Sequence, residues 1–343
     1  MSKVRVGVLM GGVSRERDVS LESGRAVCKA LKELEYTVVA SEVGDEVVDV
    51  LVKLCGHVDV IFNALHGPYG EDGCVQGLCE LLKLPYTHSG VLASALAMDK
   101  VLSKQMFRQA GIPVPDGEVR PCSAIFTEET LSFPFVVKPV GEGSSLGVHL
   151  IRSKEEKTVD DPLWSAYDEV LVEEYIPGRE LTVLVMNEKS VEVLEIKPKE
   201  GFYDFDSKYI SGFTEYIIPA PLSEKVRKTA LEYAQLAHVT LGCSGITRAD
   251  FRYDESRGVK GIKLLEINTQ PGLTATSLVP QIAAYAGLSF NALVEWIVKD
   301  AQCNALQQIQ THGSGPLSFF SRRRLSFQHV RKTPKVWSRR LLL

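Results

Sequence analysis

Apolar and polar residues alternate along the first third of the chain in a strand-and-helix order. Residues 4–10 form a valine-rich apolar run, and a glycine pair and polar residues follow it. The next apolar positions have the i, i+3, i+4, i+7 spacing of an α-helix, at Val27, Ala30, Leu31 and Leu34. A second apolar run at residues 58–65 precedes another helical repeat at residues 75–82. These units predict a parallel α/β sheet with a ligand-binding edge at the carboxyl ends of its strands.

The remainder of the chain has a different pattern. Short apolar runs typical of strands lie at residues 133–139, 148–151, 171–176, 180–185, 245–253 and 262–268. Helical repeats predict helices over residues 94–110, over residues 223–237 with Ser223 as the cap, and over a last segment that ends near Asp300. Residues 197–213 have neither period and are rich in Tyr, Phe and Lys, which favours a lid over a linker.

Residues 245–272 carry the pattern most typical of a functional site. Alternate side chains of a strand share a face. If residues 254–261 turn the chain back into a hairpin, Asp250, Glu266 and Asn268 can meet at one point. Two carboxylates and an amide are the oxygen donors that Mg²⁺ prefers, so the hairpin predicts a magnesium site.

The alternative is a polar hairpin face in water, and two features argue against it. Glu266 lies inside the apolar run 262–267, where a carboxylate is costly unless it is paired or bound to a metal. The turn that follows ends at Gly272, whose backbone N–H is accessible to a ligand.

Polar residues also follow the first two predicted strands. Glu16 lies in the first turn and His66 at the end of the second strand, so both are expected at the same sheet edge. A carboxylate there suits a substrate ammonium group. On local evidence alone an exposed loop acid and a structural histidine stay open as alternatives.

A lysine and a glycine-serine loop suggest a phosphate site. Lys138 lies among apolar residues and needs an anionic partner. Residues 141–147 supply N–H and hydroxyl groups that suit phosphate oxygens, although a plain glycine hairpin is the alternative. A strand follows this loop and Gly-Lys-Ser/Thr is absent, so it is not a Walker loop but a flap that closes on a nucleotide.

Composition narrows the class of protein. With 343 residues and 45% hydrophobic content, the chain is globular and long enough for two or three domains. From residue 301 onward there are basic residues and no acids, which predicts a flexible basic tail, or else a contact with RNA or a membrane surface. The remaining body is acidic, which argues against a nucleic-acid-binding core.

Seven cysteines without a C-x-x-C pair indicate reduced thiols and a cytoplasmic protein. No signal peptide and no apolar run long enough to span a membrane is evident. The absence of G-x-G-x-x-G argues against a Rossmann oxidoreductase.

Eight stretches occur in a characteristic order: GGVSRERDVS, LHGPYGEDG, GVLASALAMDK, FVVKP, GEGSSLG, YDFDSKY, RADF and LLEINTQPGLTATSLVP. Together they resemble the motif series of the D-alanine–D-alanine ligase family, which has the ATP-grasp fold, over residues 4–300. The resemblance implies a three-domain α+β or α/β architecture with a parallel-sheet α/β domain at residues 1–97. The central ATP-grasp subdomain would cover 98–178, the metal-binding domain 179–300 and the tail 301–343.

The resemblance also implies an activity. ATP would phosphorylate the first D-alanine, and the amine of the second would attack the acyl phosphate through a tetrahedral intermediate. D-alanyl-D-alanine for peptidoglycan synthesis, ADP and phosphate would be the products. Two Mg²⁺ ions, or Mn²⁺ in their place, would be required, and a homodimer is expected.

Residue roles carry over by motif position. Lys100 and Lys138 would contact phosphates, Ser144 and Ser145 would lie in the flap, and Lys208 would join the ATP site from the lid. The adenosine side would comprise Glu173, Glu174, Tyr175, Ile176 and Glu180. Asp250, Glu266 and Asn268 would bind the metal.

For the amino acids, Glu16 would bind the first ammonium group and His66 would lie near the first carboxylate. Ser277 and Leu278 would bind the second carboxylate. Arg248 and the Gly272 N–H would bind substrate and stabilise the oxyanion. Glu16, Ser144, Tyr209, Arg248 and Gly272 form the expected catalytic set.

Tyr209 distinguishes two products, since lactate-forming relatives have Phe at this lid position, and it therefore predicts the dipeptide. The sequence departs from the family at Gln270, where Ser is common, and at Tyr175, where Trp is common. One alternative is an ATP-grasp ligase for other substrates such as L-amino acids. Another is a non-catalytic nucleotide-binding or scaffold protein that acts through its tail, although Arg248 and the three metal-site residues are all present.

Overall fold

The computed structural model describes residues 3–125, 132–144, 146–153, 156, 167–198, 214–274 and 276–303. Residues Met1–Gln302 form one compact unit, and Cys303–Leu343 form a second. Every described helix and strand lies in the first unit. No helix among the described residues is both long enough and apolar enough to cross a membrane.

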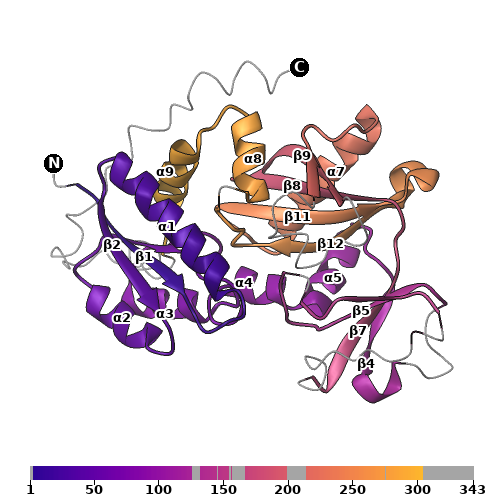
Figure 1. Cartoon of the computed structure of the whole chain (residues 1–343), viewed down its shortest axis with the longest axis horizontal. Coiled ribbons are helices and arrows are strands. Elements are labelled where there is room, and N and C mark those ends of the chain that lie inside the picture. Colours follow the sequence, from indigo (N-terminus) through magenta and orange to yellow (C-terminus); the bar gives the residue numbers. More distant parts are fainter. Residues whose placement is uncertain are drawn as a thin grey trace, which may run out of the picture. The chain divides into compact units, whose positions relative to one another are not determined.

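The amino-terminal sheet has the predicted parallel arrangement. Its order is β2-β1-β3, with β1 at Arg5–Gly11, β2 at Thr37–Val43 and β3 at Val60–Asn63. Three helices alternate with these strands: α1 at Arg17–Glu33, α2 at Val47–Leu54 and α3 at Cys74–Leu82. Alternate residues of β1 face opposite sides, since Val8 packs in one core with α1 and Leu9 in another with α2 and α3. The glycine turn after β1 and the loop after β3 therefore emerge at one edge (Figure 1).

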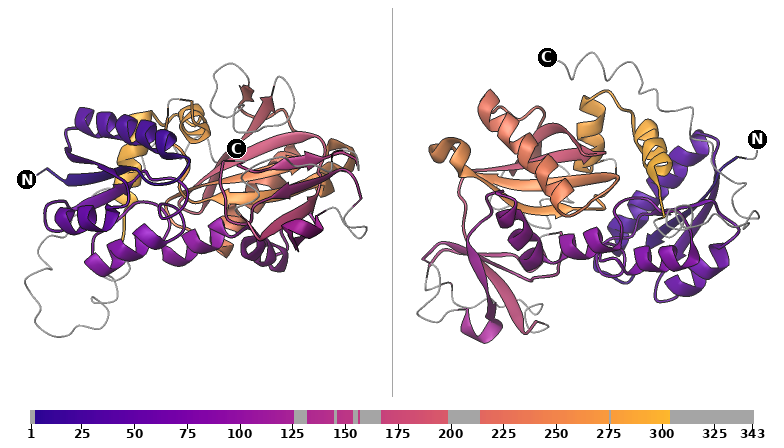
Figure 2. Two further views of the ribbon diagram at one scale, coloured as in Figure 1. Left: turned by 60° about the horizontal axis from the view of Figure 1, so that its bottom comes forward. Right: turned by 180° about the vertical axis from the view of Figure 1, so that it is seen from behind.

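The predicted single helix over residues 94–110 is wrong. The chain forms α4 at Val91–Met98 and α5 at Lys100–Gln109, with a break at Asp99. Asp99 has extended backbone angles, and its carboxylate accepts hydrogen bonds from the N–H groups of Val101 and Leu102. An aspartate in that position is an N-cap, so the second helix starts anew and its direction differs from that of the first (Figure 2).

The second sheet is antiparallel, with the order β4-β7-β5-β6. Its strands are β4 at Gly117–Pro121, β5 at Phe135–Lys138, β6 at His149–Ile151 and β7 at Glu169–Glu174, and the 3₁₀ helix η1 at Cys122–Ala124 follows β4. Phe135, Val137 and Val172 are fully buried in its small core. In the antiparallel pair β5–β7, Glu173 is opposite Val136 and Lys138 is two residues further on, so Lys138 and Glu173 lie on the same face of the sheet.

The third sheet is also antiparallel, with the order β10-β9-β8-β11-β12. Its strands are β8 at Arg179–Met186, β9 at Lys189–Pro198, β10 at Thr214–Ile217, β11 at Ile246–Tyr253 and β12 at Ile262–Asn268. The helices are α7 at Glu224–Thr240, capped by Ser223 as predicted, η4 at Glu255–Gly261, α8 at Leu278–Tyr285 and α9 at Phe290–Asp300.

Both faces of this third sheet are buried. Val183 and Val185 of β8 pack in a core with α7, while Leu184 and Met186 pack in a core with α1, α8 and α9 (Figures 1 and 2). The shared core fixes the amino-terminal sheet edge relative to the hairpin. Each of the three sheets falls within one predicted domain range, but the boundaries at residues 97, 178 and 300 stay predictions.

Candidate active site

The predicted hairpin is present, and its register brings the candidate metal ligands together. β11 and β12 are antiparallel, with Asp250 opposite Glu266 and Arg248 opposite Asn268. The turn between the two strands contains the 3₁₀ helix η4. Asp254 is the N-cap of this helix, and its carboxylate accepts a hydrogen bond from the Ser256 N–H. Asp250 and Glu266 are therefore adjacent, and Asn268 lies on the same face of β12 as Glu266, while the binding of a metal by these three residues stays a prediction.

Asp250 is held by two neighbours. Its carboxylate accepts a hydrogen bond of 2.6 Å from the Thr182 hydroxyl and bonds of 2.9 and 2.7 Å from the Arg248 guanidinium. Because Asp250 is only 8% exposed, these bonds fix the position of both Asp250 and Arg248. The metal-site carboxylate and the expected oxyanion-stabilising arginine are thus joined directly.

A pocket lies beside this hairpin and collects most of the predicted nucleotide-binding residues. Its lining includes Lys100 of α5, Lys138 of β5 and the two carboxylates of the hairpin. The end of β7, the turn after it and the start of β8 also line it, with Glu173, Glu174, Tyr175, Ile176 and Glu180. These residues come from both antiparallel sheets, which is why no single local stretch reveals the pocket.

Two lysines in this pocket have carboxylate partners. Lys138 Nζ lies 2.7 Å from Glu173 Oε2, and Lys100 Nζ lies 3.5 Å from Glu266 Oε2 and also donates to the backbone oxygen of Glu142. Burial disfavours charge on Lys138, but the Glu173 carboxylate outweighs it and the pKa of Lys138 is raised. The expectation that Lys138 needs an anionic partner is therefore confirmed.

Lys104 is a residue that the sequence interpretation missed. It lies one helical turn after Lys100 on α5, is only 2% exposed and donates to Glu173 Oε1. The available signal was the i, i+4 lysine pair, which on a surface helix ordinarily means two solvated charges. The sequence offers no sign that this helix face is covered.

Arg252 and its polar and aromatic neighbours form another part of the pocket lining. Arg252 Nε donates to the backbone oxygen of Ile176 at 3.1 Å, and Arg252 Nη1 lies 3.5 Å from Glu180 Oε2. The Arg252 guanidinium also lies 5.7 Å from the centre of the Tyr175 ring. The contacts with Arg252 fix Tyr175 and Glu180 in the pocket lining, where a planar base can stack and form hydrogen bonds.

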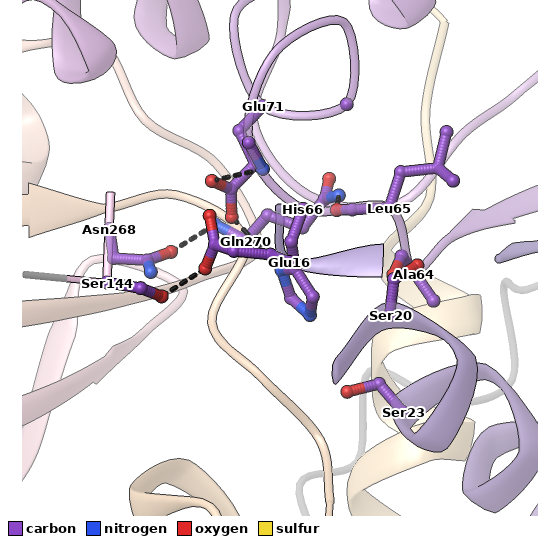
Figure 3. A network of polar contacts seen from close by, with 12 residues as sticks. Glu16, Ser20, Ser23, Ala64, Leu65, His66, Glu71, Ser144, Asn268 and Gln270 are labelled. Carbon is purple, nitrogen blue, oxygen red and sulfur yellow. Dashed lines mark hydrogen bonds and ion pairs between the residues drawn. The ribbon is translucent and has the colours of Figure 1, made fainter. Parts of the chain in front are cut away.

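A second group of polar residues lies at the edge of the amino-terminal sheet. Glu16, His66, Ser144 and Gln270 are drawn together in Figure 3. The Ser144 hydroxyl donates to Glu16 Oε1, so the glycine-serine loop contacts the turn after β1. Glu16 is 7% exposed, which rules out the alternative of an exposed loop acid.

His66 is buried and paired with Glu71. The ring Nδ1 lies 3.2 Å from Glu71 Oε1, and the Gly67 N–H donates to Glu71 Oε2 at 3.1 Å. Burial favours the neutral ring, but the Glu71 carboxylate outweighs burial and raises the pKa of His66. Among the described residues the His66 Nε2 atom has no hydrogen-bond partner. A protonated His66 suits a substrate carboxylate.

Gln270 connects the two regions. Its side-chain amide donates to the Leu65 carbonyl just before His66, and its backbone N–H donates to Asn268 Oδ1 at 2.8 Å (Figure 3). The departure from serine at this position therefore has a structural consequence, because the longer side chain spans from the end of β12 to the end of β3.

Gly272 and Ser277 lie close together. The Ser277 hydroxyl accepts from the Thr274 N–H at 3.0 Å, and a Cβ added to Gly272 would lie 3.1 Å from Ser277 Oγ. Ser277 precedes α8, and its side chain does not cap the helix. The first N–H groups of α8, from Leu278 onward, are suited to an anionic group.

Some predicted residues cannot be placed. Ser145, Lys208 and Tyr209 lie outside the described residues. Within the described ranges no group of three or more His, Cys, Asp or Glu side chains is suited to a metal ion. The predicted set has only two such side chains, with an asparagine amide as the third donor.

The fold and the pocket define a class of protein: an ATP-grasp enzyme, with lysines and carboxylates between two antiparallel sheets. Two family models match the chain. The model described as D-ala D-ala ligase N-terminus matches residues 41–89, and the one described as D-ala D-ala ligase C-terminus matches residues 106–299.

Curated and solved relatives agree with these matches. D-alanine--D-alanine ligase of Granulibacter bethesdensis is 48% identical over 307 residues, which cover 89% of this chain and all of the relative. The enzyme of the same name from Paramagnetospirillum magneticum is 49% identical over 309 residues, again 89% of this chain and all of the relative.

Among solved structures, D-alanine--D-alanine ligase from Bacillus anthracis complexed with ATP has a TM-score of 0.74 and 30% identity, and the match covers 91% of this chain and 100% of that one. VanG D-Ala:D-Ser ligase from Enterococcus faecalis has a TM-score of 0.72 and 28% identity, over 87% and 99% of the two chains. The chain belongs to the D-alanine–D-alanine ligase family.

Proposed function

We propose that this protein uses ATP to join two D-alanines into D-alanyl-D-alanine, a precursor for peptidoglycan, with ADP and phosphate as the other products. The observation that carries the proposal is the location of Asp250 opposite Glu266 beside a pocket that Lys100 and Lys138 also line. Family membership supports the same activity, because the full-length curated relatives carry this name.

The chemistry explains why a nucleotide pocket and an amino-acid site are needed together. A carboxylate does not react with an amine until it carries a good leaving group. Transfer of the γ-phosphoryl group from ATP to the first D-alanine makes an acyl phosphate. Lys100 and Lys138 are placed to neutralise the charge that this transfer concentrates.

The hairpin has the right donors for magnesium. Asp250, Glu266 and Asn268 provide hard oxygen atoms, and the two carboxylates lie opposite one another at the pocket wall. We propose that these residues hold two Mg²⁺ ions, for which Mn²⁺ can substitute. The metal would supply electrostatic stabilisation of the phosphate charge.

The first D-alanine would bind at the edge of the amino-terminal sheet. Glu16 is a buried carboxylate suited to its ammonium group, and His66, whose pKa is raised, suits its carboxylate. Contact between Ser144 and Glu16 connects this location to the glycine-serine loop that we propose covers the phosphates.

The second D-alanine would bind near the start of α8. Its carboxylate would accept from Ser277 and from the N–H of Leu278, and its amine would attack the acyl phosphate. Negative charge then develops on the former carboxylate oxygen, and Arg248 with the Gly272 N–H would stabilise it. Arg248 is already oriented by Asp250.

The lid residues Lys208 and Tyr209 and the flap residue Ser145 complete the proposal. Closure over the site would protect the acyl phosphate from water. Because Tyr209 is the lid residue associated with dipeptide products, we propose D-alanyl-D-alanine and not D-alanyl-D-lactate.

One assay tests the proposal. Purified protein is given ATP, Mg²⁺ and either D-alanine or L-alanine, while phosphate release and product chirality are followed. We expect phosphate release that depends on D-alanine, and more dipeptide than depsipeptide when D-lactate competes at neutral pH. Folded protein that releases no phosphate with D-alanine would refute the proposal, and activity with L-alanine alone would favour another amino-acid ligase.

We also propose a cytoplasmic location, because the reaction consumes ATP, and a homodimer, as the family resemblance implies. Light scattering coupled to gel filtration measures the molecular mass. We further propose domains at residues 1–97, 98–178 and 179–300, because each of these ranges contains one of the three sheets.

A further inference from the structure

Three charged side chains form a buried cluster behind the nucleotide pocket. Glu173 of β7 lies between Lys104 of α5 and Lys138 of β5. Lys104 Nζ donates to one carboxylate oxygen, and Lys138 Nζ lies 2.7 Å from the other. The side chains of Lys104, Glu173 and Lys138 are 2%, 3% and 8% exposed. Water therefore contributes little to the stability of these charges.

The two lysines lie on different sides of Glu173. Lys138 and Glu173 line the proposed nucleotide pocket together with the hairpin carboxylates. Lys104 does not line that pocket but lines a second one, on the far side of Glu173, with Arg108 and Glu118 among its other residues. Lys104 therefore acts on a nucleotide in the first pocket through its charged neighbours Glu173 and Lys138.

The charge of the cluster depends on Lys104. The charges of Glu173 and Lys138 alone sum to zero, so the positive charge of Lys138 is cancelled. With Lys104 charged, the three side chains sum to one positive charge that faces the pocket. An anionic triphosphate binds better beside a net positive cluster, and the effect is large where the dielectric is low.

We propose that Lys104 is a positioning residue for ATP: by neutralising and orienting Glu173 from behind, it leaves the charge of Lys138 available to the nucleotide phosphates. The inference rests on the proposed nucleotide site. It adds to the reaction a residue that makes no contact with the substrates.

The titration of Lys104 supports this role. Burial and the neighbouring Lys138 disfavour its charged form, the Glu173 carboxylate opposes them only in part, and the pKa of Lys104 is lowered to about 7. The other charged groups that line its pocket are Lys100, Arg108, Glu118 and Glu173. Below this pKa the cluster is positive, and above it the cluster is neutral. Affinity for ATP should therefore fall as pH rises through about 7, and bound phosphate charge should raise the pKa of Lys104.

The first test compares ATP with adenosine in binding experiments on the wild-type protein between about pH 6 and pH 9. Adenosine has no phosphates, so its affinity should not change. Two variants, Lys104→Met and the double variant Lys104→Met/Glu173→Gln, are measured in the same series. The titration of ATP itself is the same for the wild-type protein and both variants, so differences in affinity among the three proteins report the charge of the cluster.

We expect Lys104→Met to weaken ATP binding about tenfold at pH 6.5 and to abolish the protein's own pH dependence, with adenosine binding unchanged. The double variant removes one positive and one negative charge and so restores the net charge of the cluster. Because Glu173 itself lines the nucleotide pocket, this variant is compared by the ratio of its ATP affinity to its adenosine affinity, which should return toward the wild-type ratio. Lys228→Met is the matched control, because Lys228 is 75% exposed on α7.

Three results would overturn the inference. The first is a double variant whose ratio of ATP to adenosine affinity is no higher than that of Lys104→Met. The second is an equal loss of adenosine and ATP affinity in Lys104→Met. The third is a wild-type pH dependence that Lys104→Met retains. If Lys104→Met does not fold, the wild-type series still decides, because ATP affinity relative to adenosine must fall above about pH 7 by more than the titration of ATP in solution explains. If wild-type protein binds neither ligand, the proposed nucleotide site itself is wrong.

Discussion

Glu266→Gln separates the metal-binding role of the hairpin from its structural role. The substitution keeps the shape of the side chain and removes one negative charge. Glu266 lies opposite Asp250 and 3.5 Å from Lys100, and its side chain is 28% exposed. The two consequences, for stability and for turnover, differ in size.

Glu266→Gln should lower the free energy of unfolding only slightly. A partly solvated ion pair of this length contributes about 1 kcal/mol, and Lys100 keeps its hydrogen bond to the Glu142 backbone oxygen. The proposed metal site would instead lose one of its two carboxylates. We expect kcat/KM for magnesium-ATP to fall about 100-fold or more, which corresponds to about 2.7 kcal/mol.

The measurement is phosphate release against Mg²⁺ concentration at saturating D-alanine, together with urea unfolding of both proteins. The variant should need more Mg²⁺ for half-maximal rate and should unfold at nearly the same urea concentration. Glu232→Gln is the control, because Glu232 is 60% exposed on α7 and pairs only weakly with Lys228 at 3.7 Å. A folded Glu266→Gln protein with wild-type rate and wild-type Mg²⁺ dependence would refute the assignment.

Three further predictions concern stability and the tail. Burial raises the pKa of Asp300 to about 6, so between about pH 4 and pH 6 the folded protein binds more protons than the unfolded chain, and above that range the charged carboxylate destabilises the fold. Asp300→Asn should therefore raise the free energy of unfolding by about 2 kcal/mol at about pH 8 and leave it unchanged below about pH 4. Urea unfolding at both pH values measures this difference. Ser223→Ala removes the hydroxyl that accepts a hydrogen bond of 3.4 Å from the Val226 N–H at the start of α7. Thermal unfolding should show that the protein loses about 1 kcal/mol of stability, and an unchanged melting temperature would show that the cap contributes nothing. Removal of residues 304–343 should leave phosphate release unchanged, because full-length relatives match only 89% of this chain; loss of activity would give the tail a part in the reaction.

Local sequence patterns predicted most elements of this fold. The glycine turn after β1, the Ser223 cap and the β11–β12 hairpin each depend on neighbours within a few residues, and all three are present. The helix over residues 94–110 failed for an equally local reason. Neither α4 nor α5 contains a glycine or proline that would mark a break, and the capping preference of Asp99 decided against one continuous helix.

The candidate site was predicted in part for a similar reason. Asp250 and Glu266 belong to adjacent strands of one hairpin, which the local pattern predicted. The register shift between Asp250 and Phe251, which places Asp250 opposite Glu266 and not Leu265, is seen only in the structure. Lys104 gave no such signal, because its partner Glu173 is 69 residues further along the chain. A lysine one turn after another lysine has the same local pattern whether that helix face is solvated or covered.

The sequence by itself determined most of the strands and helices, the donor types and the family, because hydrophobic period, capping and motif spacing are local properties. Only the tertiary structure decided which distant groups meet. Ser144 reaches Glu16 across 128 residues, and Gln270 reaches Leu65 across 205. The Gln270 contact exists because β8, α1, α8 and α9 bury their apolar faces in one shared core, which fixes the sheet edge against the hairpin. The free energy of that burial is summed over many residues, so no single stretch of sequence encodes the pairing of the charges that it encloses.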